Sequence, residues 1–526
     1  MNSINVSIPR ADKPEDVGVS SAAIAEYVRD IEKSGIESHS LMIIRHGKVA
    51  YESWRKPYAA DIPHIMYSVS KSIMSIAAGF AITEGYMTPE TRLVDVFPEF
   101  VPANPDEALE KITLHQLMTM TVGKNVSPLA DKTSHHWVRD FMEVKQTFQP
   151  GEGWTYVNEN TYCVAAMISK LTGMSVTDYL KPRLYEPLGI TSYQWERDHT
   201  GVETGGWGLY LKTEDLAKIA LCCLNDGVYN GKQIIPKEWL DLACSDLTSG
   251  IPDAPAYGYG YFIWGCDTPD TVRFDGMFSQ LAYIYKEYDA VVVLTNNEII
   301  EEKAIQCYRR YFPDAFFDNV NPPTVEIPEF TELKEISPMP RQPETEAKIS
   351  GRTVKCKSNP VLDVLGYPLS LLTFPAIYMS ALKPGPVDNF RFSFYDDECT
   401  MYWTEGNETN IIHIGLDGVP RKSKIRLGKI DYTASSTGAW LDKDTLELHI
   451  RPLESLNKRI FRFTFKGNRV TLKPSSDPDI KYIAEKVLPS VKHMMPNPTA
   501  YKMFSKFVLN CHKLVDAPIR GNFVNK

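Results

Sequence analysis

Hydrophobic and polar residues follow two different periods along the chain, and the change of period divides it into two regions. Up to about Phe312, runs with apolar residues at helical spacing, such as 161–173 and 213–227, are separated by shorter strand-like runs. The segment 39–54 has the pattern of a β-hairpin that turns at His46–Lys48. The first region is therefore predicted to mix helices and strands.

From about Ile349 the period changes to two, as expected for strands with one buried face. Phe461, Phe463 and Phe465 alternate with polar residues before a turn at Gly467–Asn468. We therefore expect an antiparallel β-barrel or sandwich here. The preceding segment has six prolines and many charges, which is typical of an interdomain linker. The expected boundaries are 1–320 for the first domain, 321–348 for the linker, 349–480 for the β-rich domain and 481–526 for a C-terminal helical tail.

Composition supports this division and excludes some partners. At 526 residues, the chain exceeds the size at which one hydrophobic core usually keeps growing, so two or more domains are expected. With 43% hydrophobic residues and 57 basic against 66 acidic side chains, it resembles an ordinary soluble protein that does not bind nucleic acid. The uncharged stretch 364–382 is broken by Pro368 and Pro375, so we expect no membrane span and no membrane partner. The sequence does not indicate an oligomeric state.

The N-terminus and the cysteines predict the compartment. Residues 1–20 lack the apolar core of a secretory signal, so we expect a cytoplasmic protein. The nine cysteines include no C-x-x-C pair, which favours reduced thiols over disulfides or a zinc cage. The eleven histidines form no H-E-x-x-H motif. Neither a metal nor a cofactor is expected.

The first candidate chemistry is a serine placed three residues before a lysine, at the start of the long apolar run in 66–87. On a helix, Ser68 and Lys71 would share one face, with their Cβ atoms about 5 to 6 Å apart. A serine hydroxyl is a poor nucleophile without a base, and a lysine can act as that base when loss of water lowers its pKa. Because the residues that follow are apolar, this helix is predicted to be buried, and Ser68 and Lys71 become candidate catalytic residues.

The S-x-x-K tetrad alone is a weak signal, because it occurs four times in the chain. The other copies begin at Ser53, Ser380 and Ser455, and none opens a buried apolar helix. A competing interpretation makes Ser68 a helix N-cap beside a lysine that extends to solvent. The tetrad by itself leaves both interpretations open.

A tyrosine favours the catalytic interpretation. Tyr156, Val157 and Asn158 form the only Y-x-N of the chain, in a glycine-rich loop before a predicted helix. A tyrosine can carry a proton when a nearby cation lowers its pKa, and Lys71 would provide that cation. Isolated tyrosines often just pack against a helix start, but beside Ser68 and Lys71 this simpler interpretation is weaker.

These motifs, with further blocks in the order 112–123, 150–158, 179–195 and 205–218, resemble the serine β-lactamase and penicillin-recognising superfamily. The chain is most similar to its class C-like branch of esterases, D-aminopeptidases and 6-aminohexanoate-oligomer hydrolases. The resemblance covers about Pro14 to Asn297. It implies an α/β (α+β) fold, in which helices flank an antiparallel sheet and the active site lies between the sheet and a mostly helical subdomain.

The resemblance also implies roles for individual residues. Ser68 would be the nucleophile, and Lys71 and Tyr156 would move its proton. Asn158 would donate a hydrogen bond to the carbonyl side of the substrate. Trp207 would line the cleft, although an aromatic residue beside glycines is as often part of a core.

The third motif of the family is a Lys-Thr-Gly or His-x-Gly strand, and its best match here is Phe274–Gly276. The basic residue is absent, which argues against an efficient β-lactamase, and Arg273 would point away from Phe274. Gly276 would let a substrate approach the strand edge. The backbone N–H groups of Ser68 and of a residue near Met277 would form the oxyanion hole.

The function that the resemblance implies is a serine hydrolase that cleaves an ester or amide through a Ser68 acyl-enzyme. Its partner would be a small-molecule ester or amide, including a D-amino acid amide or a short oligoamide. One alternative is penicillin-binding or β-lactamase activity on β-lactams. A second is a binding or sensor protein without turnover, and a third places the function in a ligand-binding C-terminal barrel.

Overall fold

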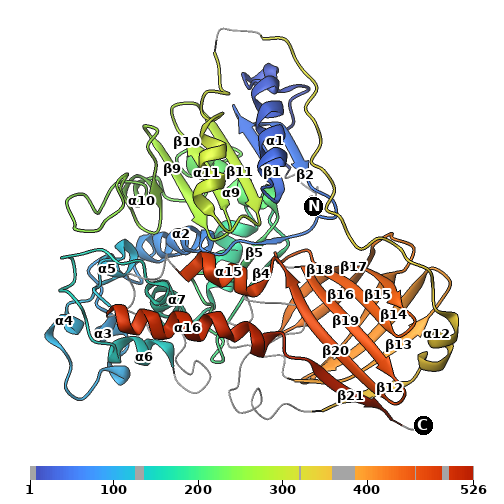
Figure 1. The fold of residues 1–526 in the computed structure, drawn as a ribbon. Helices are drawn as coiled ribbons and strands as arrows, with labels where there is room; N and C mark the ends of the chain where they lie inside the picture. Colours follow the sequence, from blue (N-terminus) through green and yellow to red (C-terminus); the bar gives the residue numbers. More distant parts are fainter. Residues whose placement is uncertain are drawn as a thin grey trace. The chain divides into compact units, whose positions relative to one another are not determined.

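The computed structural model describes residues 7–124, 136–318, 322–357, 386–456, 458–488 and 497–524. The chain forms two compact units, Met1–Thr331 and Glu332–Lys526 (Figure 1). The change from one unit to the other falls inside 321–348, the segment expected to be a linker. Helix α12 (Pro343–Ile349) begins within that segment.

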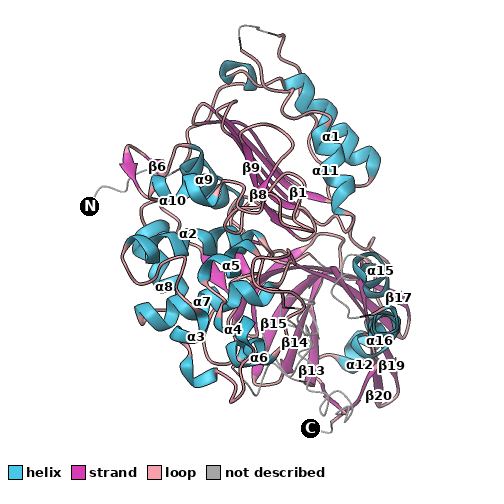
Figure 2. Cartoon of the chain, turned by 90° about the vertical axis from the view of Figure 1, so that its left-hand side faces the viewer, coloured by secondary structure: helices cyan, strands magenta, loops and turns pink. Residues whose placement is uncertain are grey.

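The first unit is built on an antiparallel sheet (Figure 2). Its described strands follow the order β2-β1-β11-β10-β9-β8. Every residue of β1, β10 and β11 is buried, so both faces of the sheet centre need cover. The hairpin predicted in 39–54 is confirmed, because β1 and β2 pair across the turn at His46 and Gly47. The strands are β1 (Ser38–Arg45), β2 (Lys48–Trp54), β8 (Trp264–Gly265), β9 (Thr271–Gly276), β10 (Gln280–Tyr285) and β11 (Ala290–Asn296).

Helices cover both faces of this sheet. On one face, α1 (Ser21–Ser34) and α11 (Glu301–Arg309) lie beside the strands (Figure 1). Ile24 of α1, Tyr308 of α11 and Leu294 of β11 belong to one buried hydrophobic core. Helix α9 (Thr213–Leu224) packs against β1, β10 and β11 outside that core. This arrangement confirms the predicted sheet flanked by helices.

The helical subdomain surrounds α7 (Asn158–Thr172), which contacts α2 (Val69–Thr83) and α5 (Leu114–Thr119). Helix α2 also contacts β9, so it connects the subdomain to the sheet. It is buried from Val69 to Ala81, as its apolar sequence predicts. The other elements of this unit are η1 (Pro14–Val17), β3 (His64–Ile65), α3 (Leu93–Val96), η2 (Pro98–Phe100), α4 (Glu107–Glu110), α6 (Trp137–Glu143), α8 (Val176–Leu180), η3 (Lys181–Tyr185), β4 (Tyr193–Trp195), β5 (Leu209–Leu211), β6 (Val228–Tyr229), β7 (Lys232–Gln233) and α10 (Lys237–Ala243).

The second unit is a barrel. Its described strands follow the order β15-β14-β13-β12-β21-β20-β19-β18-β17-β16, and a bridge between Gly415 of β15 and Thr437 of β17 closes the sheet. Of the two architectures expected for this region, the barrel is therefore the correct one. The strands are β12 (Thr353–Cys356), β13 (Val387–Phe394), β14 (Glu398–Glu405), β15 (Glu408–Gly415), β16 (Arg421–Leu427), β17 (Ile430–Asp442), β18 (Thr445–Pro452), β19 (Lys458–Lys466), β20 (Arg469–Asp477) and β21 (Ile519–Phe523).

The period of two explains this barrel. Phe461 and Phe463 of β19 are fully buried, and Phe463 packs edge-on against Phe390 and Phe392 of β13. The tail expected to be helical contains α15 (Ile480–Val487) and α16 (Pro498–Val515), but it ends in β21, which pairs with β12 and β20. Such a short strand is stabilised by partners distant in sequence, so its local pattern does not reveal it.

No helix in the described part of the chain is both long and apolar enough to cross a bilayer. The described residues contain no group of three or more His, Cys, Asp or Glu side chains arranged to hold a metal ion. The cysteines whose side chains are described are free thiols.

A tight contact on α2 generates a prediction about stability. A Cβ at Gly79 would lie 2.3 Å from the Trp239 ring of α10. Alanine is usually favoured over glycine in a helix by about 1 kcal/mol, yet we expect Gly79→Ala to lower the free energy of unfolding by about 1 to 3 kcal/mol through overpacking. Urea unfolding followed by the helical circular dichroism signal measures this change.

The matched control combines Gly79→Ala with Trp239→Leu, which removes the ring from the contact. We expect the double variant to lose less stability than the two single variants lose in sum, because the clash is absent. A stabilised Gly79→Ala protein, or simple additivity, would show that α2 can shift away from Trp239.

Candidate functional site

Ser68 lies at the start of α2, where the helix meets the edge of the sheet. It occupies the N-cap position with helical backbone angles (φ −72°, ψ −8°), and its side chain makes no capping hydrogen bond. The preceding residue, Tyr67, has a φ of 44°, in the left-handed region that non-glycine residues rarely adopt. The Ser68 hydroxyl is therefore not used by the helix end, and it accepts a hydrogen bond from Lys71 instead.

The Lys71 amine is held by three oxygen acceptors. Its Nζ lies 2.9 Å from Ser68 Oγ, 2.7 Å from Asn158 Oδ1 and 2.8 Å from the Gly206 carbonyl oxygen. The side chain does not extend to solvent, since only 1% of the residue is exposed. Burial lowers the pKa of Lys71 to about 7, and the Glu159 carboxylate opposes the shift. Near neutral pH, a large fraction of this amine is uncharged.

Tyr156 reaches Ser68 from the loop before α7. Its hydroxyl hydrogen-bonds with Ser68, and Lys71 Nζ lies 4.8 Å from the centroid of its ring. Burial raises the pKa of Tyr156 well above the ordinary value, and the hydrogen bond to Ser68 opposes this only in part. The expectation that Lys71 lowers the pKa of Tyr156 is therefore wrong, because the amine is itself desolvated and faces the ring. Tyr156 stays a neutral phenol.

Asn158 and Gly206 position the amine. A charged lysine only donates hydrogen bonds, and Lys71 Nζ donates to Asn158 Oδ1, so Asn158 Nδ2 is the atom that can donate to a ligand. A Cβ at residue 206 would lie 3.1 Å from Lys71 Nζ. The carbonyl of Gly206 was not predicted as part of the site. The glycine pair at 205–206 was the available signal, because glycine permits such a close approach.

Trp207 was expected to line the cleft, but its ring lies in the interior. It is 4% exposed and stacks on Trp137 at a centroid distance of 6.1 Å. Its carbonyl oxygen accepts hydrogen bonds from Trp195 and Thr204. The contribution of this segment to the Ser68 cluster is thus the backbone of Gly206, and the indole beside it packs in the core.

Strand β9 brings the third motif against the start of α2. A Cβ on Gly276 would lie 2.5 Å from the Met66 carbonyl oxygen and 3.1 Å from the Val69 nitrogen. Glycine is therefore needed for contact between two backbones, whereas the sequence suggested substrate access. Met277 follows the strand with a side chain that is 39% exposed, and Phe274 is fully buried.

The chain after Met277 adopts an uncommon conformation. Phe278 and Ser279 have φ values of 62° and 65°, and the Phe278 ring lies 5.2 Å from that of Tyr67. Left-handed residues thus occur on both segments that meet at Ser68. Such backbone is retained where the surrounding structure holds it, often at functional sites. The sequence does not indicate this feature, since neither residue type favours a positive φ.

The sequence also did not predict a charged group beside Tyr156, which is formed by Arg273, Asp275 and Glu301. Arg273 Nε donates to Asp275 Oδ2 at 2.7 Å, and the Glu301 carboxylate accepts a hydrogen bond from the Phe278 N–H. The charges of Asp275 and Glu301 both act on Tyr156. Glu301 belongs to α11, which follows β9 by some distance in sequence, so only the folded chain brings these residues together.

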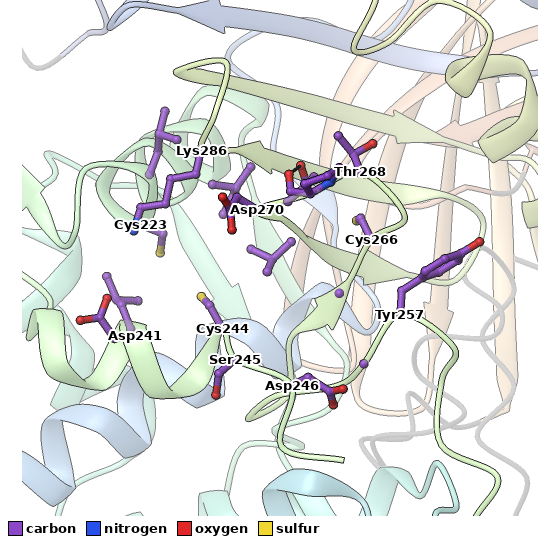
Figure 3. Close-up of a pocket in the computed structure, with 18 of the residues that line it drawn as sticks. Cys223, Asp241, Cys244, Ser245, Asp246, Tyr257, Cys266, Thr268, Asp270 and Lys286 are labelled. Carbon is purple, nitrogen blue, oxygen red and sulfur yellow. Dashed lines mark hydrogen bonds between the residues drawn. The ribbon is translucent and has the colours of Figure 1, made fainter. Parts of the chain in front are cut away.

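A separate cavity of about 380 Å³ lies between α9, α10 and the sheet edge (Figure 3). Cys223, Cys244 and Cys266 line it together with Lys286. Ser68, Lys71 and Tyr156 are not among its lining residues. Burial raises the pKa of the Cys244 thiol to about 12, so this thiol is protonated and unreactive at neutral pH. The cavity therefore lacks the chemistry found around Ser68.

Comparison with known proteins gives distant relatives. The chain is 24% identical over 260 residues to the 6-aminohexanoate-dimer hydrolase of Paenarthrobacter ureafaciens, which covers 46% of this chain and 65% of the relative. It is 24% identical to the lovastatin esterase of Penicillium rubens over 27% of this chain and 41% of that protein. The chain thus spans less than two thirds of the length of each of these relatives.

A family model matches most of the first unit, and a solved structure is similar to part of the chain. A putative 6-aminohexanoate-dimer hydrolase from Bacillus anthracis is 22% identical, with a TM-score of 0.48, over 58% of this chain and 86% of that one. The family model described as Beta-lactamase matches residues 22–310. That range contains Ser68, Lys71, Tyr156 and Gly276 and more than half of the chain. The chain belongs to the beta-lactamase family.

Proposed function

We propose that this protein is a serine hydrolase that cleaves an ester or amide of a small molecule through an acyl-enzyme on Ser68. The observation that carries the proposal is the buried Lys71 amine, 2.9 Å from Ser68 Oγ, whose pKa burial lowers to about 7. A desolvated lysine within hydrogen-bond reach of a serine is a base matched to neutral pH.

In the first step, Ser68 Oγ attacks the carbonyl carbon and its proton passes to Lys71 Nζ. The bond from carbon to the leaving oxygen or nitrogen then breaks, and the leaving group receives that proton. Tyr156, a neutral phenol hydrogen-bonded to Ser68, is placed to pass it on. Water next attacks the acyl carbon and gives a proton to Lys71 Nζ. The bond from that carbon to Ser68 Oγ then breaks, the acid leaves, and Oγ takes the proton back from Lys71.

The developing oxyanion needs donors as well. We assign this role to the backbone N–H groups of Ser68 and Met277. The close contact of Gly276 with the backbone of Met66 and Val69 supports this assignment. One such donor is typically worth about 10²- to 10³-fold in rate. Asn158 Nδ2 is the side-chain donor for the substrate.

The relatives and the third motif bear on the substrate. One relative is named as a hydrolase of the 6-aminohexanoate dimer and another as an esterase, which supports ester or amide cleavage. Phe274 stands where the resemblance expects a basic residue, and Arg273 is bound to Asp275. A site without a freely available cation at this strand disfavours the carboxylate of a β-lactam, so we place β-lactam turnover second.

The first test is substitution of the nucleophile. Ser68→Ala is expected to lower kcat/KM by about 10³-fold or more on short p-nitrophenyl esters, and to abolish labelling by a fluorophosphonate probe. Intact-mass and peptide analysis should place the adduct on Ser68. Ser53→Ala is the matched control, because Ser53 and Lys56 form the same S-x-x-K tetrad at the end of β2 and should be dispensable.

Two results would contradict this assignment. An adduct on another residue, or esterase activity that survives Ser68→Ala, would show that Ser68 is not the nucleophile. Labelling of Ser68 with no turnover of esters, amides or β-lactams would instead favour a binding protein that acylates without hydrolysis.

The second test is the pH dependence. Lys71 must be uncharged to accept the Ser68 proton, and its pKa is about 7. For an uncharged ester, kcat/KM should therefore rise with pH by about tenfold per unit below that pKa and level off above it. A ¹³C-lysine NMR titration measures the same pKa directly. Burial also lowers the pKa of Lys124, to about 8, so the Lys71 signal is identified by its loss in Lys71→Arg. A profile that is flat through neutral pH would exclude Lys71 as the base.

A further inference from the structure

Two buried histidines of the first unit, His39 and His64, form a chain of hydrogen bonds that has no role in the proposed chemistry. Both residues are at most 4% exposed. His39 Nδ1 lies 2.8 Å from His64 Nε2, and His39 Nε2 lies 2.9 Å from Glu37 Oε1. His64 Nδ1 lies 3.0 Å from the Ile65 carbonyl oxygen. We call Glu37, His39, His64 and the Ile65 carbonyl the histidine chain.

The acceptors at the two ends of the histidine chain determine where its protons lie. A carbonyl oxygen only accepts, so His64 Nδ1 carries a hydrogen. Burial lowers the pKa of His64 to about 3, so this ring is neutral and must accept at Nε2. Glu37 Oε1 also accepts from Asn297 Nδ2, as a carboxylate does. His39 therefore donates at both nitrogens, and an imidazole that does so carries a positive charge.

The surroundings of His39 suit a buried cation. The ring of Tyr58 stacks on it at a centroid distance of 3.7 Å, and an aromatic face attracts positive charge. The guanidinium of Arg55, which donates to the Ser38 carbonyl oxygen, is paired with Glu32. Glu37 supplies the negative charge beside His39.

An irregularity of β1 places His39 in this chain. The register between β1 and β11 shifts between Ser38 and Ser40, which makes His39 the extra residue of a β-bulge. Its carbonyl oxygen accepts the Arg55 N–H at 2.9 Å. Bulges redirect a side chain, often next to active sites, and this one brings the imidazole to His64.

One end of the histidine chain holds the segment before the proposed nucleophile. His64 and Ile65 form β3, which pairs with β5 and ends three residues before Ser68. Tyr67, in between, has a φ of 44°, a conformation that the surrounding structure has to hold. By bonding to His64, His39 anchors the strand from which this turn starts.

The other end holds the segment after β9. The Glu37 carbonyl oxygen accepts the Asn297 N–H at 2.7 Å, in addition to the bond between their side chains. The next residue, Glu298, donates its N–H to the Phe278 carbonyl oxygen at 3.3 Å. Phe278, which has a positive φ, follows Met277, the residue to which we assign an oxyanion donor. The histidine chain is thus connected to both backbone segments that the proposed acyl transfer uses.

We propose that Glu37, His39 and His64 position the backbone on both sides of the nucleophile, and that this requires the positive charge on His39. The inference rests on the proposed acyl transfer at Ser68. The three side chains are positioning residues, which act through residues 65–68 and 277–279 and exchange no proton with the substrate.

The charge is tested with Glu37→Gln, which keeps the shape of the side chain and removes its charge. Histidine ¹⁵N spectra report the protonation of each ring, and the His39 signals are identified by their loss in His39→Gln. His39 should be doubly protonated in the wild type at pH 8, where an ordinary histidine is neutral, and neutral in Glu37→Gln. On short p-nitrophenyl esters, kcat of Glu37→Gln should fall by about tenfold or more, because a displaced nucleophile slows the chemical step. KM should change by less than about twofold.

The hydrogen bond is tested with two substitutions of similar size. The amide oxygen in His64→Gln can accept from His39 Nδ1, whereas the side chain in His64→Leu cannot. We expect His64→Leu to lower kcat by about tenfold and His64→Gln by at most about threefold. The ¹³C-lysine titration should give the wild-type pKa for Lys71 in both, which separates positioning of Ser68 from an effect on its base.

His46→Gln is the matched control. His46 pairs with Asp289 at 2.8 Å beyond the other end of β1, and both side chains are 49% exposed. Its kcat and KM should equal those of the wild type. Circular dichroism and urea unfolding establish that each variant is folded under the assay conditions.

Three results would overturn the inference: a neutral His39 in the wild type at pH 8, wild-type kcat in Glu37→Gln, or equal losses in His64→Leu and His64→Gln, which would indicate packing alone. A wild-type protein that neither turns over esters nor reacts at Ser68 with the fluorophosphonate would instead reject the proposed function. The positioning role would then fall with it, whatever charge the ¹⁵N spectra show on His39.

Discussion

The site depends on keeping one amine out of water. Burying Lys71 costs free energy, because its charged form loses hydration, and the fold compensates in two ways. It surrounds Nζ with Ser68 Oγ, Asn158 Oδ1 and the Gly206 carbonyl, and it lets the pKa fall to about 7. The three acceptors come from the N-cap of α2, the first residue of α7 and the loop before β5, so these three segments must all be in place before Lys71 has its hydrogen bonds.

Close backbone contacts make this geometry possible. Gly276 allows β9 to touch the first turn of α2, and Gly206 allows a carbonyl to approach the amine. Tyr67 and Phe278, with positive φ values, turn the chain on either side of that contact. The same tight packing that fixes the start of α2 therefore also holds the end of β9 against it.

The sequence predicted those parts of the site that depend on residues close together in the chain. The three-residue spacing of Ser68 and Lys71 before an apolar helix specifies both their common face and their burial. The alternation around Phe463 likewise predicts the barrel hairpin. It could not reach Glu301, whose contact with Phe278 forms only when α11 packs on the sheet, or the strand β21, whose partners are far away in sequence. The sequence interpretation also gave the wrong direction for the pKa shift of Tyr156. Burial of the phenol raises this pKa, and the nearby amine is itself desolvated and does not reverse the shift.

The pleat of β9 gives this strand two faces with different side chains. Successive side chains of a strand point to opposite faces, so Phe274 and Gly276 face α2 while Arg273 and Asp275 face the side of α11. The first face touches the start of α2 through Gly276, and the second carries the ion pair of Arg273 with Asp275. A fold shared with β-lactamases therefore does not determine the substrate, because the two faces of one strand can carry different side chains independently.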